Sequence, residues 1–221
     1  YLEEDQQIKE NPFRKLKLRI RTPRVLPRTI PMPLIERMLN VAYQDIADSS
    51  GQKKKSAIQN ALVLELLFST GMRVGELCKL LKADINIESG SLLIMGKGAK
   101  ERVLQIGSMS VIELLREHCS QSECPRGALL VNRKGRPLSE QSVRAIVKKY
   151  ALRADTQMHI TPHMFRHSFA TALVEANVDI RCIQKLLGHS SILTTQIYTD
   201  VSTAKQREIL INYHPRNQMN I

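Results

Sequence analysis

The chain has 221 residues, of which 33 are Lys or Arg and 21 are Asp or Glu, so its formal net charge is +12 at pH 7. A hydrophobic content of 43% with 24% charged residues is typical of a globular chain and argues against overall disorder. No stretch approaches about 18 consecutive apolar residues, which excludes a transmembrane helix by the usual length criterion. The basic balance predicts a polyanionic partner, either nucleic acid or an anionic membrane surface.

The N-terminal stretch is predicted to be a basic connector and not a core element. Seven basic residues and no acidic one lie between Arg14 and Arg28. Membrane binding would need an amphipathic helix, and Pro23 and Pro27 interrupt one, so this run favours nucleic acid. The first residue, Tyr1, predicts that the sequence is part of a longer chain, and no signal-peptide pattern follows it.

The hydrophobic pattern predicts helices in the first third of the chain. Apolar side chains recur at helical spacing over 34–46, and a polar loop is expected over 48–55. Residues 57–68 are apolar on nearly all sides, as in a central buried helix. Gly71 can end that helix, and a short helix is expected over 74–81.

Three short antiparallel strands are predicted next, because the apolar period changes from helical spacing to alternation. They cover residues 84–87, 91–95 and 102–106. Turns are expected at Ser89-Gly90 and at 96–98, where glycines flank Lys97.

Helical periodicity returns in the second half of the chain. Residues 143–151 form an i, i+3, i+4 apolar face. Thr161 and Pro162 can open the next helix, with the threonine hydroxyl as its cap. Further helices are expected over 178–187 and 192–200. The sum predicts an α+β fold, mainly helical with a small three-stranded antiparallel sheet.

The cysteine pattern predicts reduced thiols and a cytoplasmic location. No C-x-x-C spacing and no secretion signal accompany Cys78, Cys119, Cys124 and Cys182. No metal is expected, because the His163 and His167 pair lacks the intervening Glu of a zinc-protease helix and Arg166 would repel a cation. The phosphate-loop spacing is absent around Lys97, so no nucleotide cofactor is expected either.

Six polar residues stand where a core pattern would not place them, and together they suit an anion. They are Arg73, Lys97, His163, Arg166, His189 and Tyr198. His163 and Arg166 share a face in the first turns of a helix, where the helix dipole favours negative charge. Each residue alone also has an ordinary structural explanation: Arg73 can pair with Glu76, and Tyr198 can be a core or interface tyrosine.

Four stretches taken together resemble the catalytic domain of the tyrosine recombinases, the phage integrase family. They read TGMRVGEL at 70–77, GKGAKER at 96–102, HMFRHSFAT at 163–171, and LGH followed by TTQIY between 187 and 198. The likeness extends over residues 30–205 in the family's order and spacing. It is nearest to the bacterial Xer-type and mobile-element integrases.

The resemblance implies a site-specific recombinase or integrase that cuts and rejoins DNA through a covalent 3′-phosphotyrosine and exchanges strands between two duplexes. It implies that Tyr198 is the nucleophile and that Arg73 and Arg166 clamp the phosphate, with Glu76 supporting Arg73. Lys97 would be the acid that protonates the leaving oxygen. His163 would assist proton transfer at the tyrosine, and His189 would hydrogen-bond the phosphate. A tyrosine hydroxyl has an ordinary pKa near ~10, so its attack needs help from a base or from charge. The arginines can supply that charge in place of metal ions, so no metal or cofactor is implied.

The resemblance also implies an organisation and a set of partners. Residues 1–28 would be the linker from a preceding DNA-clamping domain, 29–203 the catalytic domain, and 204–221 a tail. The tail would be either a helix that docks on a neighbouring subunit or an ordinary frayed end. The implied partners are double-stranded DNA, a homo-tetramer on the synapse and accessory DNA-bending proteins, in a bacterial, nucleoid-associated setting. DNA contacts are predicted for Arg14, Lys15, Lys17, Arg19, Arg21, Lys100 and Arg102.

Two alternatives remain open at this point. A type IB topoisomerase would use the same chemistry to nick and reseal one duplex, and the spacing from Leu187 to Tyr198 argues against it. A DNA-binding module without catalysis would need none of the six residues, and the intact set argues against that.

Overall fold

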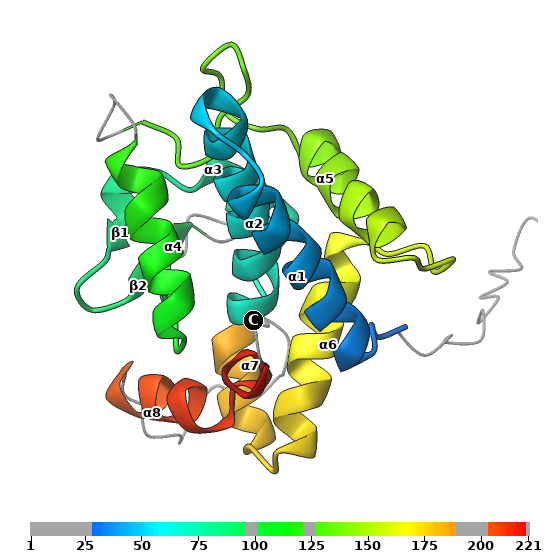
Figure 1. The fold of residues 1–221 in the computed structure, drawn as a ribbon. Coiled ribbons are helices and arrows are strands. Elements are labelled where there is room, and N and C mark those ends of the chain that lie inside the picture. Colours follow the sequence, from blue (N-terminus) through cyan, green and yellow to red (C-terminus); the bar gives the residue numbers. More distant parts are fainter. Residues whose placement is uncertain (1–27, 96–100, 122–126, 189–202, 220–221) are drawn as a thin grey trace, which may run out of the picture.

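One buried helix, α2 (Gly51–Thr70), forms the centre of the fold in this computed structural model, which describes residues 28–95, 101–121, 127–188 and 203–219. Its side chains from Ala57 onward are almost all buried, because a helix that is apolar on every side must be covered on every side. Figure 1 shows α1 (Met32–Ala47), α4 (Met109–Ser120) and α6 (Pro162–Glu175) around it.

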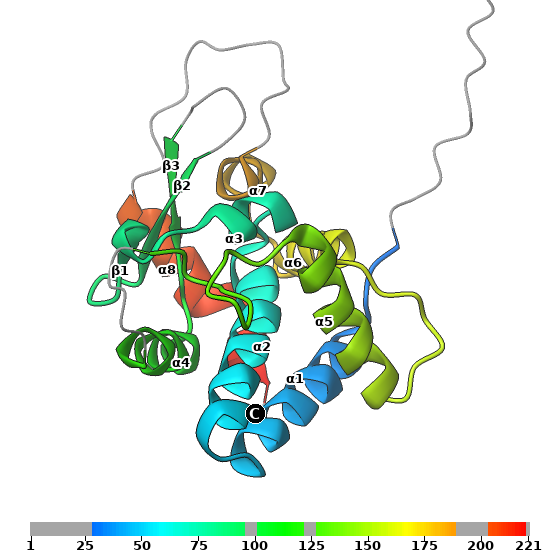
Figure 2. The same cartoon turned by 90° about the horizontal axis from the view of Figure 1, so that it is seen from above.

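The predicted sheet is confirmed. Strands β1 (Ile85–Asn86), β2 (Ser91–Met95) and β3 (Glu101–Gln105) pair antiparallel in the order β1-β2-β3. Leu92 and Leu104 lie opposite each other and are buried, while Leu93 and Val103 beside them are more exposed, as the period of two requires. Seen from above, the sheet and α4 lie on one side of α2, and α5 (Glu140–Arg153) and α6 lie on the other (Figure 2).

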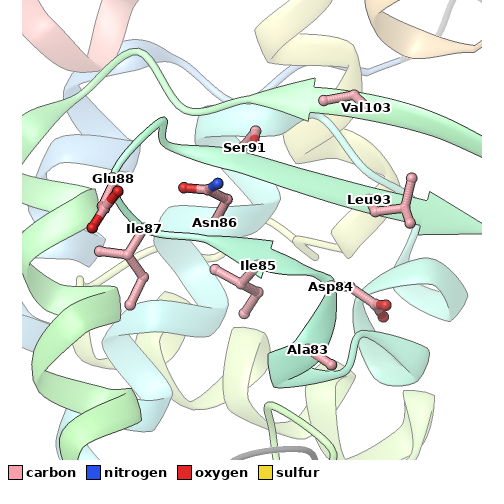
Figure 3. A pocket seen from close by; sticks show the side chains of 9 residues that line it. All are labelled: Ala83, Asp84, Ile85, Asn86, Ile87, Glu88, Ser91, Leu93 and Val103. Carbon is pink, nitrogen blue, oxygen red and sulfur yellow. The ribbon is translucent and has the colours of Figure 1, made fainter.

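The outer face of the sheet carries a shallow hollow beside the 3₁₀ turn η1 (Lys82–Asp84), drawn in Figure 3. Its lining is mainly apolar with two carboxylates, and consists of Ala83, Asp84, Ile85, Asn86, Ile87, Glu88, Ser91, Leu93 and Val103. None of the predicted catalytic residues that the structure describes lines this hollow. It therefore lies outside the candidate site.

Two glycines with positive φ end the helices that frame the site. Gly71 (φ 60°) ends α2, as predicted, and Gly188 (φ 65°) ends α7 (Ile180–Leu187). A Cβ on Gly71 would stand 2.5 Å from Cδ1 of Phe169, so α6 lies directly against the end of α2. The short helix predicted after Gly71 is α3 (Val74–Lys79).

Two local predictions were wrong. Helix α2 begins at Gly51, so most of the loop expected over 48–55 is helical; Gln and Lys are good helix formers, and adding turns to an existing helix costs little. Thr161 precedes α6, but its side chain makes no capping hydrogen bond. The helix predicted over 192–200 lies outside the described residues.

The C-terminal segment packs onto the body of its own chain. Helix α8 (Thr203–Tyr213) buries Ile209 and Leu210, and Leu210 joins an apolar cluster with residues of α6 and α7. The turn η2 (Pro215–Gln218) follows, and it buries Arg216 against Glu65 of α2. Whether this tail also contacts a neighbouring subunit stays a prediction.

Among the described helices, none combines the length and the apolarity that a membrane span requires.

Candidate active site

Arg166 is the most firmly held of the predicted site residues. It projects from α6, is buried, and donates through Nη1 to the carbonyl oxygen of Gly71 and through Nη2 to that of Leu187, both at 2.7 Å. These carbonyls belong to the ends of α2 and α7, where helical acceptors are left without intrahelical partners. The guanidinium therefore joins three helices at one point.

Arg73 lies two residues beyond Gly71, at the start of α3, with about half of its side chain exposed. Its backbone N–H donates to Oε2 of Glu76 at 2.8 Å, and its Nη1 donates to Oε1 at 3.1 Å. The support of Arg73 by Glu76, which the resemblance implied, thus has a direct geometric basis. The catalytic role of Arg73 stays a prediction.

Arg102 on β3 also binds Glu76. Its Nη1 and Nη2 donate to the two carboxylate oxygens at 2.9 and 2.8 Å, a bidentate ion pair. Burial alone would raise the pKa of Glu76, but the hydrogen bonds from Arg102 and from the backbone of Arg73 lower it overall. The sequence did not reveal this pairing, although Arg102 stands in one of the stretches that carry the resemblance.

The charges at this point are predominantly positive. The pKa of Arg166 is lowered to about 10, mainly by burial and also by the nearby charges of Arg73 and Arg102, while Glu76 opposes this shift. Arg166 still carries its charge at pH 7. Three guanidiniums against one carboxylate leave an excess positive charge, which suits a phosphate group.

His163 lies one turn before Arg166 on α6 and is exposed. Its Nε2 lies 2.9 Å from Nε2 of His167, so one ring donates and the other accepts. The rings are T-shaped with centroids 4.3 Å apart. Within the described ranges, no group of three or more His, Cys, Asp or Glu side chains could hold a metal ion.

Several predicted site residues lie outside the described residues. Those are Lys97, His189, Tyr198, Lys100 and the N-terminal Arg14, Lys15, Lys17, Arg19 and Arg21. The structure therefore brings together Arg73, Glu76, Arg102 and Arg166, with His163 three residues before Arg166 on the same helix.

The fold and the site together define a mainly helical α+β domain that carries a cluster of three arginines around one carboxylate. Residues 36–205 match the model of the phage integrase family. The chain is 49% identical over 98% of its length to a tyrosine recombinase of Agathobacter rectalis, of which it covers 72%. It is 35% identical over 98% of its length to tyrosine recombinase XerC of Bacillus pumilus, of which it covers 70%.

Solved structures of recombinases share this fold. The crystal structure of XerA recombinase superimposes with a TM-score of 0.66 at 26% identity, over 90% of this chain and 68% of that one. The XerH site-specific recombinase bound to its difH substrate gives 0.64 at 27% identity, over 79% of this chain and 50% of that one.

The chain therefore belongs to the phage integrase family. Its function is that of a site-specific DNA recombinase, an enzyme that breaks and rejoins DNA, and the topoisomerase and non-catalytic alternatives are not favoured.

Proposed function

We propose that Arg73 and Arg166 clamp the scissile phosphate of double-stranded DNA while Tyr198 attacks it. The observation that supports this most is the anchoring of Arg166. Of the five N–H donors of a guanidinium, two are bound to the carbonyls of Gly71 and Leu187. The rest of the group is thereby fixed in direction, so its charge needs no reorganisation as negative charge builds on the phosphate.

The proposed step is a transesterification, in which one phosphodiester bond is exchanged for another. The Oη atom of Tyr198 attacks phosphorus, the bond from phosphorus to the 5′ oxygen breaks, and a 3′-phosphotyrosine forms. The tyrosine proton passes to His163, and Lys97 gives a proton to the leaving 5′ oxygen. His189 donates a hydrogen bond to the phosphate. The roles of Lys97, His189 and Tyr198 rest on the resemblance alone.

A covalent intermediate suits an enzyme that must rejoin what it cuts. Hydrolysis would lose the free energy of the phosphodiester bond, whereas the phosphotyrosine bond retains it for attack by a second strand. The reverse step uses the same groups with their proton roles exchanged.

The proposed partners are double-stranded DNA and further copies of the chain, assembled as a tetramer on two duplexes. The XerH relative is described with DNA bound before cleavage. Lambda integrase, which shares this fold, is described as a tetramer on a Holliday junction. Accessory DNA-bending proteins and nucleoid association stay predictions of the resemblance.

A nicked suicide duplex tests the proposal. A binding site selected from a randomised pool is placed in the duplex, and the full-length protein is incubated with it and then denatured. We expect a denaturation-resistant adduct from the parent and from the control Tyr213→Phe, a tyrosine exposed on α8. Tyr198→Phe should give none. Plasmid relaxation with no joined products between paired sites would instead support the topoisomerase alternative.

A further inference from the structure

Glu76 is shared by two arginines from different parts of the fold. Its two carboxylate oxygens accept two hydrogen bonds from Arg102 and two from Arg73, one of these from the Arg73 backbone. A carboxylate offers about four acceptor positions, so this one is saturated. The side chain of Glu76 is 8% exposed, that of Arg102 18% and that of Arg73 48%. Arg73 is therefore the solvent-facing arginine of the two, and Arg102 is the more buried one.

The end of α7 fixes the other side of Arg102. A Cβ on Gly188 would stand 2.9 Å from Nε of Arg102 and 3.0 Å from its Cδ and Cζ, so a larger residue there would have to displace the arginine side chain. That Nε is buried and finds no hydrogen-bond partner among the described residues. Leu187, the residue before Gly188, accepts a hydrogen bond from Arg166. The two arginines thus hold the same turn of chain.

We infer that Arg102 is a positioning residue for the recombination reaction and does not contact DNA phosphate. Both of its Nη atoms are bound to Glu76, and its Nε faces the buried side. Arg102 holds Glu76, and Glu76 holds the backbone and the guanidinium of Arg73. The inference rests on the proposed function, because it assigns Arg102 to the support of the Arg73 clamp.

The two roles for Arg102 differ in what they change. A phosphate contact adds about 0.9 to the slope of log affinity against log salt, and its loss weakens binding. A positioning residue leaves that slope unchanged and alters the reaction rate at saturation, because a displacement of about 1 Å at the reacting groups can cost about 100-fold.

The test measures both quantities on the full-length protein with the selected nicked duplex. The variants are Arg102→Gln and Arg102→Lys, with Arg116→Gln as the matched control, since Arg116 is an exposed arginine on α4. Binding is followed across a salt series, and cleavage is followed in single turnover at saturating protein.

We expect Arg102→Gln to lower the saturated cleavage rate about 10–100-fold with the salt slope unchanged. Arg102→Lys keeps the charge but not the bidentate fork, so its rate should fall between those of the parent and Arg102→Gln, and it carries the test if Arg102→Gln does not fold. Arg116→Gln should change neither quantity. A decrease of about 0.9 in the slope, or an unchanged saturated rate, overturns the inference.

A double-mutant cycle separates positioning through Glu76 from a general loss of structure. If Arg102 acts through Glu76, then Glu76→Gln combined with Arg102→Gln loses no more rate than the worse single variant. Independent, multiplying losses overturn the inference. The proposed function has its own control: if Arg73→Gln cleaves at the parental rate, the phosphate clamp is wrong whatever Arg102 does.

Discussion

Replacing Arg216 with methionine should destabilise the domain strongly, because it leaves a buried carboxylate without its cation. The Nε of Arg216 donates to both oxygens of Glu65, at 2.8 and 2.9 Å. Glu65 is fully buried in α2 and Arg216 nearly so. Breaking such a pair by removing one partner costs about 3–5 kcal/mol. For a domain of this size that corresponds to a Tm about 8–16 °C lower, taking about 4 kcal/mol.

The assay is urea unfolding at several pH values. Burial raises the pKa of Glu65 and Arg216 opposes this, so in Arg216→Met the pKa of Glu65 rises further. The folded variant then keeps a proton that the unfolded chain releases above its ordinary pKa near 4.5. The free energy of unfolding of the variant should therefore fall as the pH increases from about 5 to 8.

The control variant also lacks the arginine side chain but removes the charge of Glu65 as well. Glu65→Gln combined with Arg216→Met should recover a large part of the loss, because a neutral amide is cheaper to bury and can still accept from the hydroxyl of Tyr43. A loss below about 1 kcal/mol for Arg216→Met alone would refute the packing of the C-terminal turn against α2.

Three further outcomes follow from the described geometry. Gly71→Ala should cost about 2–4 kcal/mol in urea unfolding, because its φ of 60° strains an alanine and its Cβ would stand 2.5 Å from Phe169; a loss under about 1 kcal/mol would contradict this. Burial lowers the pKa of His214 to about 4, so the folded state binds fewer protons than the unfolded state. The free energy of unfolding should therefore fall by up to about 3 kcal/mol as the pH drops from 7 to 4, and its difference between the parent and His214→Gln should narrow. Arg166→Lys keeps the charge but not the fork that reaches the carbonyls of Gly71 and Leu187, so the single-turnover cleavage rate should fall about 10²–10³-fold; a parental rate would exclude the anchored clamp.

The elements of the fold were largely predictable because they depend on local patterns. The apolar run over 57–68 identified the central helix, and the alternation over 84–87 with the turn at Ser89-Gly90 identified the first two strands. The start of α2 was missed because its first turns carry no apolar signal: Gln and Lys suit a loop and an exposed helix equally.

The candidate site was predictable only in part, because its geometry depends on contacts between distant residues. The spacing around Arg166 marked it as a site residue, but no pattern shows that it binds carbonyls at Gly71 and Leu187. Arg102 was predicted to contact DNA, and its partner in the structure, Glu76, stands 26 residues earlier. A charged side chain looks the same in a sequence whether it faces a phosphate or a carboxylate.

The buried C-terminal anchor was missed for a related reason. His214 and Arg216 lie in a polar tail, where exposed side chains are the usual expectation. Only the fold brings them under α2, where Nε2 of His214 donates to the carbonyl oxygen of Ser69, 2.9 Å away, and Arg216 meets Glu65.

The most direct test of the central claim is to identify the amino acid that carries the DNA. The adduct from the nicked duplex is digested with protease and nuclease, and the remaining nucleotide-linked peptide is sequenced by mass spectrometry. We predict a single linkage, from the Oη atom of Tyr198 to the 3′ phosphate of the cleaved strand. A linkage at another residue, or to a 5′ phosphate, would contradict the account.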